Sequence, residues 1–347
     1  MTWIGLIRCP SCERALPPAP DGSVQCSSCP RTIQSVEDIP VFAVRSSQLD
    51  QLAAGVRASH LFNSEVAVQD HVDYTAHTLA IHRVLLELIE RLAPQARQQR
   101  LKVLDVGGGR GELAFLFADR FDTAMIDIDL DSVIIARALQ TTDRPFAVLC
   151  GDCSLLPLTA DSADIVIAKE TAHHMPDPPT FFAELARVAG RAGLVLVVEG
   201  IASSLADREQ AAANDRMRQL GATHHHFILR DLSDMLSGIF DVSQIVWTQP
   251  QLFEKVLRRT GLPKLGERLD RLWHFLPRRV RLAALRVSGG PVVFACRGDA
   301  RSERGAPSLA PAETLVDYPV ELREINPLST SAIDHIRSTL LNADNGR

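Results

Sequence analysis

Four cysteines near the start of the chain form two pairs whose spacing is typical of a metal site. Cys9 and Cys12 make the first pair, and Cys26 and Cys29 make the second after thirteen intervening residues. Two Cys-x-x-Cys pairs at this separation can place four thiolates around one Zn²⁺, and a site closed by four cysteines is structural. Two disulfides are the alternative, which the lack of a secretory signal peptide disfavours. We therefore expect residues 1–45 to form a zinc ribbon.

A glycine turn is the second candidate site. The run LKVLDVGGGRGE combines a short apolar strand, the glycines Gly107, Gly109 and Gly111, and the start of a helix. It departs from the dinucleotide pattern G-x-G-x-x-G because Glu112 stands where the last glycine would be. Asp105 precedes the turn, and acids on both sides would repel a pyrophosphate. They suit a ligand that carries an ammonium and a sulfonium group.

Two more acids follow the next two strands. Asp127 ends the second strand, where its carboxylate can bind both hydroxyls of a ribose. Asp152 follows the third, where it can accept a hydrogen bond from an adenine amino group, and Cys153 can offer its backbone N–H to the same ring. A redox role for the thiols of Cys150 and Cys153 is the alternative. Acids in this order predict a nucleoside site at the carboxyl ends of parallel strands.

Histidines at the same edge are candidate general bases. His173 and His174 follow the fourth strand, with Glu170 just before them, and the run 224–226 is three histidines of which His226 or His225 can enter an acceptor pocket. A base is needed when the acceptor keeps its proton at neutral pH. The alternatives are that the first two histidines only shape the cofactor pocket and that the later ones are solvated loop residues.

The elements that must position these residues alternate between strand and helix. Strands are predicted over 101–106, 123–126, 146–149, 164–168 and 193–198, and helices over 77–92, 112–120, 130–139 and 179–189. This alternation indicates an α/β parallel sheet with helices on both faces. Residues 46–76 are expected to form a linker or lid in which His71 and Tyr74 fold over the cofactor, residues 200–290 the acceptor side, and residues 299–347 a tail that is partly disordered or draped on the surface.

The motifs of residues 75–297 resemble the class I S-adenosylmethionine (SAM) methyltransferases, especially the type-11 group of small-molecule enzymes. The matching runs are DVGGGRG, GDCSLLPL, HHMPDP and the E-x-x-R-V stretch from Glu184 to Gly193. The resemblance implies a Rossmann-like sheet of seven strands with an antiparallel edge strand near Pro291–Cys296, in a domain over residues 77–298. The run IQSVEDIPVF after the second cysteine pair resembles a zinc-ribbon family that includes activator subunits of methyltransferases. This chain has Glu37-Asp38 where that family has Asp-Gly.

The resemblance implies a SAM-dependent methyltransferase (EC 2.1.1.-) that acts on a small-molecule acceptor in specialised, natural-product metabolism, with SAM as cofactor and Zn²⁺ in the ribbon. The residues that it implies for the cofactor are Asp105, Gly107, Gly109, Gly111, Asp127, Ile128, Asp152, Cys153, Lys169 and Tyr74. The catalytic candidates are His174, His173, His226 and Glu170. An rRNA or tRNA methyltransferase, a SAM enzyme that acts on a peptide or catalyses another reaction, a SAM-binding fold without activity, and a doubly wound fold for another nucleotide are the alternatives.

The composition of the chain argues against nucleic acid and membranes as binding partners. The 347 residues have a net charge of −5 and only 5% aromatic side chains, so the chain has neither a general attraction to nucleic acid nor a stacking surface for bases. Without an apolar run of about 18 residues, we expect a cytoplasmic protein with no membrane partner, for which a homodimer stays open.

Overall fold

The computed structural model describes residues 2–9, 12–16, 24–26, 28–29, 32–36, 38–42, 81–202, 225–248, 275–298 and 311–316, with residues 335 and 338. The strands are β1 (Val24–Gln25), β2 (Thr32–Val36), β3 (Ile39–Phe42), β4 (Lys102–Val106), β5 (Asp122–Asp127), β6 (Ala147–Gly151), β7 (Ile165–Lys169), β8 (Leu194–Ile201), β9 (Asp241–Thr248), β10 (Gly290–Arg297) and β11 (Ala312–Val316). The α-helices are α3 (Glu112–Phe117), α4 (Leu130–Leu139), α5 (Pro178–Ala189), α7 (Leu229–Ile239), α10 (Arg278–Ser288) and a helix over 81–92. The 3-10 helices are η1 (Thr2–Leu6), η2 (Pro94–Arg97) and η3 (Ala172–His174).

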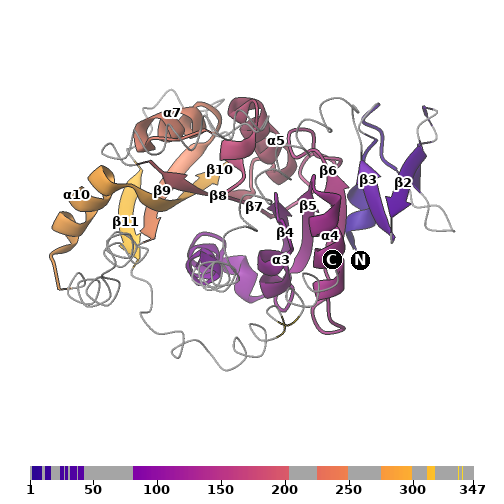
Figure 1. The fold of residues 1–347 in the computed structure, drawn as a ribbon, viewed down its shortest axis with the longest axis horizontal. Coiled ribbons are helices and arrows are strands. Elements are labelled where there is room, and N and C mark those ends of the chain that lie inside the picture. Colours follow the sequence, from indigo (N-terminus) through magenta and orange to yellow (C-terminus); the bar gives the residue numbers. More distant parts are fainter. Residues whose placement is uncertain are drawn as a thin grey trace.

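The centre of the fold is a parallel sheet. Strands β6, β5, β4, β7 and β8 lie side by side in that order and run parallel (Figure 1). They are almost wholly buried, as expected for parallel strands that helices cover on both faces. The order reverses between β4 and β7, so the loops that leave these two strands part, and a crevice for a ligand is expected at this edge. The predicted α/β sheet is therefore confirmed.

The sheet differs from the predicted one in two ways. It has eleven strands among the described residues, in the order β1-β2-β3-β6-β5-β4-β7-β8-β10-β9-β11, of which the seven from β4 to β10 lie within residues 77–298. Three strands of the N-terminal segment extend one end, and β11, from the predicted tail, pairs parallel with β9 at the other. The antiparallel strand β10 is present, but it lies between β8 and β9 rather than at the edge.

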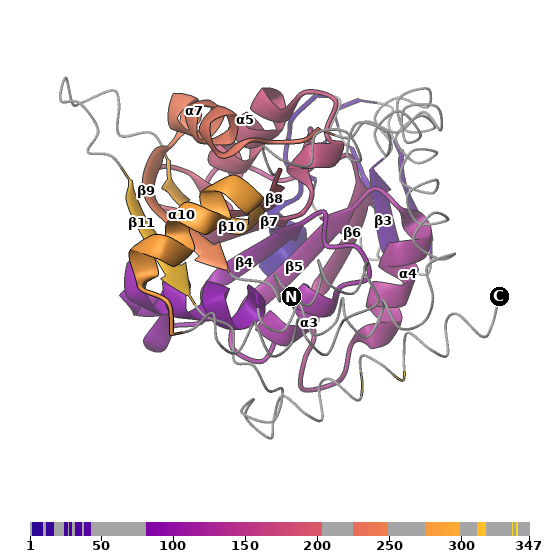
Figure 2. The same cartoon turned by 60° about the vertical axis from the view of Figure 1, so that its left-hand side comes forward.

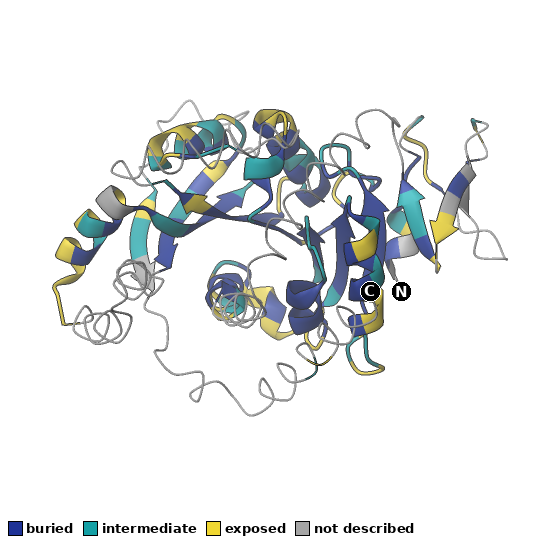
Figure 3. Cartoon of the chain, viewed as in Figure 1, coloured by how far each residue is buried: buried dark blue, intermediate teal, exposed yellow. Residues whose placement is uncertain are grey.

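Helices form a layer on each face of the sheet. One layer holds α5 and α7, whose residues Phe181, Phe182 and Leu232 share a buried cluster with the strands (Figures 1 and 2). The opposite layer holds the helix over 81–92, α3 and α4. Figure 3 shows buried residues along the strands between the layers and exposed residues on the outer sides of the helices. Within the described part of the chain, no helix is long and apolar enough to cross a bilayer.

Candidate functional site

The four N-terminal cysteines converge. Their sulfur atoms all lie within 4.8 Å of one another, and they are the one group among the described residues that could hold a metal ion. Cys9 Sγ lies 3.5 Å from Cys29 Sγ, and Cys12 Sγ lies 3.4 Å from Cys26 Sγ. Sulfur atoms bound tetrahedrally to one Zn²⁺ are about 3.8 Å apart. The donor set therefore fits the predicted zinc ion.

The turn that follows Cys26 favours the thiolate form of its side chain. The backbone N–H of Ser28 donates to Cys26 Sγ at 3.4 Å, and this contact is the main reason why the pKa of Cys26 falls to about 6. A thiolate, not a thiol, is the form that binds zinc. The short spacing of the second cysteine pair thus places a backbone N–H against Cys26 Sγ and favours the charged form of this ligand.

The glycine turn has the backbone that its sequence predicts. Gly107, Gly109 and Gly111 have φ values of 71°, 53° and 81°, in the left-handed region that favours glycine. At Gly107 there is also no room for a side chain, because a Cβ there would lie 2.3 Å from Thr171 Oγ1. The turn after β4 is therefore packed against the loop after β7.

Asp127 connects the end of β5 to this turn. Its Oδ2 accepts a hydrogen bond from the backbone N–H of Gly109 at 2.8 Å, and its Oδ1 accepts one from Asp129 at 2.9 Å. A carboxylate has about four acceptor positions. Asp127 can therefore hold the turn and still accept hydrogen bonds from two ligand hydroxyls, as the sequence analysis expects.

Three buried charges lie beneath the turn. Asp105 and Glu112 are acids and Lys169 is a base, and all three side chains are almost completely buried. Burial raises the pKa of Asp105 to about 7, although the Lys169 ammonium lowers it. Burial also raises the pKa of Glu112. Together with Asp127 they make three carboxylates, which outnumber the cations that act on them, the Lys169 ammonium and, at Glu112, the Arg110 guanidinium. This site therefore favours a cationic ligand group.

The Oδ2 atom of Asp105 could accept a hydrogen bond from a ligand. No protein group among the described residues donates a hydrogen bond to its buried Oδ2. A buried carboxylate oxygen without a donor is costly, and a cationic donor would remove that cost. This is the observation by which the site fits the ammonium end of SAM and opposes a phosphate.

The adenine side of the predicted site is the loop after β6. Asp152 Oδ1 accepts hydrogen bonds from Ser154 N at 2.8 Å and Ser154 Oγ at 2.6 Å, so the carboxylate has a set orientation. Ile128, next to Asp127, is partly exposed at the same edge. Cys153 is buried, and burial raises its thiol pKa, while burial raises that of Cys150 to about 12. Thiols of this kind are unreactive, which argues against the redox alternative.

The candidate general bases lie in the segments that follow β7 and β8. His173 Nδ1 lies 2.7 Å from Glu199 Oε2. Burial alone would lower the pKa of His173, but the Glu199 carboxylate outweighs it and the pKa is raised. The other oxygen of Glu199 accepts hydrogen bonds from the backbone N–H of Thr171 and Ala172 at 3.0 and 2.7 Å. Glu199 thus fixes both the ring and the loop that carries it.

The remaining candidates lie around this pair. The ring of His174 is 4.0 Å from that of His173. His225 donates its backbone N–H to the His173 carbonyl at 2.7 Å, which places the adjoining His226 beside the same loop. Glu170 has a φ of 52°, rare for a residue other than glycine, and lies 3.9 Å from the Lys169 ammonium.

Some expectations cannot be compared with the structure, and one residue was missed. Tyr74, His71 and the whole of 46–76 lie outside the described residues. Glu199 was not predicted from the sequence. The signal was present, because an acid in the apolar strand LVLVVEGI is expected to have a partner if it is buried.

Comparison with known proteins agrees with this geometry. Residues 104–197 match a family model described as a methyltransferase domain. The matched segment contains the glycine turn, Asp127 and Asp152. A malonyl-[acyl-carrier protein] O-methyltransferase of Geobacter sulfurreducens is 29% identical over 165 residues, which are 46% of this chain and 61% of that protein. A ubiquinone/menaquinone biosynthesis C-methyltransferase of Dinoroseobacter shibae is 33% identical over 126 residues, 34% of this chain and 49% of that protein.

The same comparisons reach only part of each protein. The chain spans less than two thirds of the length of these curated relatives. Among solved structures, the YcgJ protein of Bacillus subtilis aligns with 60% of this chain and 98% of its own, with 20% identity and a TM-score of 0.41. The family match ends within β8, before Glu199 and the segment that contains His225. The family match therefore does not include the groups from these two segments that contact His173.

Proposed function

We propose that the chain is a SAM-dependent methyltransferase (EC 2.1.1.-) that acts on a small-molecule acceptor. The observation that carries the proposal is the set of three buried carboxylates around a glycine turn, Asp105, Glu112 and Asp127, which outnumber the positive groups of Lys169 and Arg110 beside them. Such a seat repels a phosphate and attracts a ligand with an ammonium and a sulfonium group. The family match over 104–197 supports the same ligand.

The residues that would hold SAM lie along the carboxyl ends of β4 to β7. Asp105 would face the methionine ammonium, with Lys169 balancing the buried acids, and the turn of Gly107, Gly109 and Gly111 would let the backbone approach the ligand closely. Asp127 would accept hydrogen bonds from the ribose hydroxyls. The adenine ring would lie between Ile128 and the Asp152–Cys153 backbone, with the Asp152 carboxylate accepting from its amino group. Tyr74 stays a prediction as a lid residue.

We assign the role of general base to His173. Because Glu199 can only accept at Nδ1 when it is ionised, the neutral ring carries its proton there and leaves Nε2 to take a proton from the acceptor. When bound, SAM supplies a methyl group that its sulfonium already activates. The protein has to align the acceptor with it, exclude water and remove the proton, and alignment alone can supply roughly 7–11 kcal/mol.

The other candidates are less suited to this role. Glu170 lies near the Lys169 ammonium, which favours its role in charge balance, whereas the Glu199 carboxylate at Nδ1 fixes the tautomer of His173. His174 and His226 would instead line the acceptor side. A base with a fixed tautomer favours an acceptor whose nucleophilic atom carries a proton at neutral pH, as a hydroxyl group does. Natural-product metabolism and a cytoplasmic location stay predictions, as does a homodimer.

Titration of the purified protein tests the proposal. Calorimetry with SAM, S-adenosylhomocysteine, NAD and ATP is expected to show binding of the first two only. Asp127→Asn removes one charged acceptor, which contributes about 1.5–3 kcal/mol, so SAM affinity is expected to fall roughly 10- to 100-fold. Asp131→Asn, an exposed position on α4, is the matched control. A wild-type protein that ignores SAM and takes up NAD or ATP would overturn the assignment.

A further inference from the structure

The N-terminal segment contacts the chain directly before the loop that carries Asp152. Strand β3 lies parallel to β6 and extends the sheet beyond it, so that Val41 pairs with Cys150 and Phe42 pairs with Gly151. The two backbones are close, since a Cβ on Gly151 would lie 3.2 Å from Phe42 Cβ. Strand β6 ends at Gly151, directly before Asp152. The position at which the loop begins is therefore set in part by the ribbon.

The same segment contacts the chain just beyond the other end of the loop. The backbone N–H of Arg8 donates to the Pro157 carbonyl at 3.0 Å, and that of Thr159 donates to the Leu6 carbonyl at 2.9 Å. Between these contacts Ile7 and Leu158 form an antiparallel bridge. Backbone contacts with the ribbon thus lie on both sides of residues 152–155.

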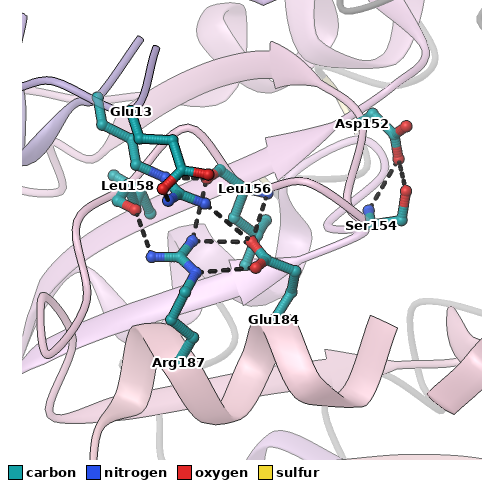
Figure 4. Close-up of polar contacts among 8 residues, drawn as sticks. Glu13, Asp152, Ser154, Leu156, Leu158, Glu184 and Arg187 are labelled. Atoms are coloured by element: carbon teal, nitrogen blue, oxygen red, sulfur yellow. Dashed lines mark hydrogen bonds and ion pairs between the residues drawn. The ribbon is translucent and has the colours of Figure 1, made fainter. Parts of the chain in front are cut away.

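A buried guanidinium reinforces this second attachment. Arg8 is almost fully buried, and its Nε donates to the Leu156 carbonyl at 3.3 Å. Its two terminal nitrogens lie 3.4 Å from carboxylate oxygens of Glu13 and Glu184. Arg187 contacts both oxygens of Glu184 at 2.8 Å, so the two guanidiniums share this carboxylate (Figure 4). A buried charge is tolerated when its partners are arranged in this way.

Leu156, the first residue after the loop, is held through both of its backbone groups. Its N–H donates to Glu184 Oε2 at 3.0 Å, and its carbonyl accepts from Arg8 and Arg187. Within the loop, Asp152 accepts hydrogen bonds from Ser154, as described above, and Figure 4 shows this pair to the right of the cluster of Arg187 and Glu184. The carboxylate therefore belongs to a short loop whose two ends are both fixed.

We propose that the zinc ribbon positions the adenine-binding loop, with Arg8 as a positioning residue for Asp152. The inference rests on the proposed function, because it takes Asp152 as the acceptor for the adenine amino group. A metal that folds the ribbon would then also set the affinity and selectivity for the nucleoside, although the zinc site and the nucleoside site share no residue. The ribbon acts within this chain as a built-in part of the cofactor site.

Arg8→Met tests the proposal, with Arg14→Met as its control. Arg187 still neutralises Glu184 in the first variant, so the fold is expected to survive, and Arg14 is an exposed ribbon residue whose guanidinium contacts Ser28. Loss of the Arg8 contacts is expected to weaken S-adenosylhomocysteine binding about tenfold, which corresponds to one charged hydrogen bond. Zinc content and melting temperature are measured on both variants, and chelation of zinc from the wild type is expected to weaken binding in the same direction.

Selectivity separates positioning from general destabilisation. S-inosylhomocysteine replaces the adenine amino group by an oxygen, so the wild type is expected to prefer S-adenosylhomocysteine, and Arg8→Met is expected to lose most of this preference. Hydrogen exchange of residues 150–158 is expected to become faster. Arg8→Lys keeps the positive charge but lacks the planar guanidinium with its several N–H donors. It provides a second variant if methionine is not tolerated. Unchanged selectivity and exchange in folded, zinc-loaded variants would overturn the inference, whereas a wild type that binds neither ligand would overturn the proposed function itself.

Discussion

Replacement of Glu199 by Gln tests whether His173 is held as the geometry indicates. Glu199 contacts His173 through Oε2 and two backbone N–H groups through Oε1. Glutamine has the same shape, and its oxygen can keep the two backbone hydrogen bonds. Its amide NH₂, however, would face Nδ1 in place of a carboxylate oxygen. The negative charge that orients the ring and favours its protonated form is then lost.

The size and the sign of the effect follow from the lost contact. A hydrogen bond between charged groups contributes about 1.5–3 kcal/mol, so the variant is expected to lose about 2 kcal/mol of unfolding free energy when His173 is protonated. Glu199 raises the pKa of His173 above its ordinary value of 6.5. The extra stabilisation is therefore fully present below pH 6.5 and is lost as the pH rises through the raised pKa. The deficit of the variant must be larger in acid than in base.

Urea unfolding at about pH 5.5 and about pH 9 measures this deficit, and proton–nitrogen correlation spectra of the imidazole follow the titration of His173. The pKa of His173 is expected to fall in the variant. Glu87→Gln is the matched control, since Glu87 pairs with Arg83 on an exposed helix surface and is expected to change stability by less than about 0.5 kcal/mol. An equal deficit at both pH values, or an unchanged titration of His173, would refute the reasoning.

Two further predictions concern the turn after β4. Gly107→Ala places a Cβ at positive φ and against Thr171, so it is expected to lose more than about 1 kcal/mol of unfolding free energy, while Gly200→Ala, with no atom within 4 Å, is not; equal stability of the two variants in urea would contradict this. Because the pKa of Asp105 is about 7 and a cation favours the carboxylate, SAM affinity measured by calorimetry is expected to rise by up to about tenfold between pH 6 and pH 8. S-adenosylhomocysteine keeps the ammonium that Asp105 would face and is expected to show a similar rise; a flat profile for both ligands would contradict this prediction.

Local sequence patterns predicted the central strands and the turn well. Apolar runs bounded by glycine and acid residues mark buried parallel strands, and the helix at 130–139 has the predicted bounds. The three turn glycines were also predicted, since left-handed backbone is a local property. Such patterns depend on neighbours within a few residues, and the sequence therefore contains them in readable form.

Long-range pairings were not predictable in the same way. Arg8 meets Glu184 across 176 positions of the chain, and nothing near Arg8 indicates that it is buried. The joining of β3 to β6 and of β11 to β9 depends on which sheet edges stay open once the centre has formed. Likewise, a strand pattern at 290–297 does not reveal whether the strand lies inside the sheet or at its edge.

The boundary of the family match explains why the cofactor can be inferred and the acceptor cannot. The match ends at residue 197, two residues before Glu199. His173 therefore lies inside the matched segment, but the carboxylate that orients it and the backbone of His225 that contacts it come from the part that follows. The carboxylates and glycines proposed to hold SAM lie at the ends of β4 to β6, inside the matched segment, whereas Glu199 and His225 lie beyond it. Because an O- and a C-methyltransferase are both among the relatives, similarity to them does not select the acceptor atom.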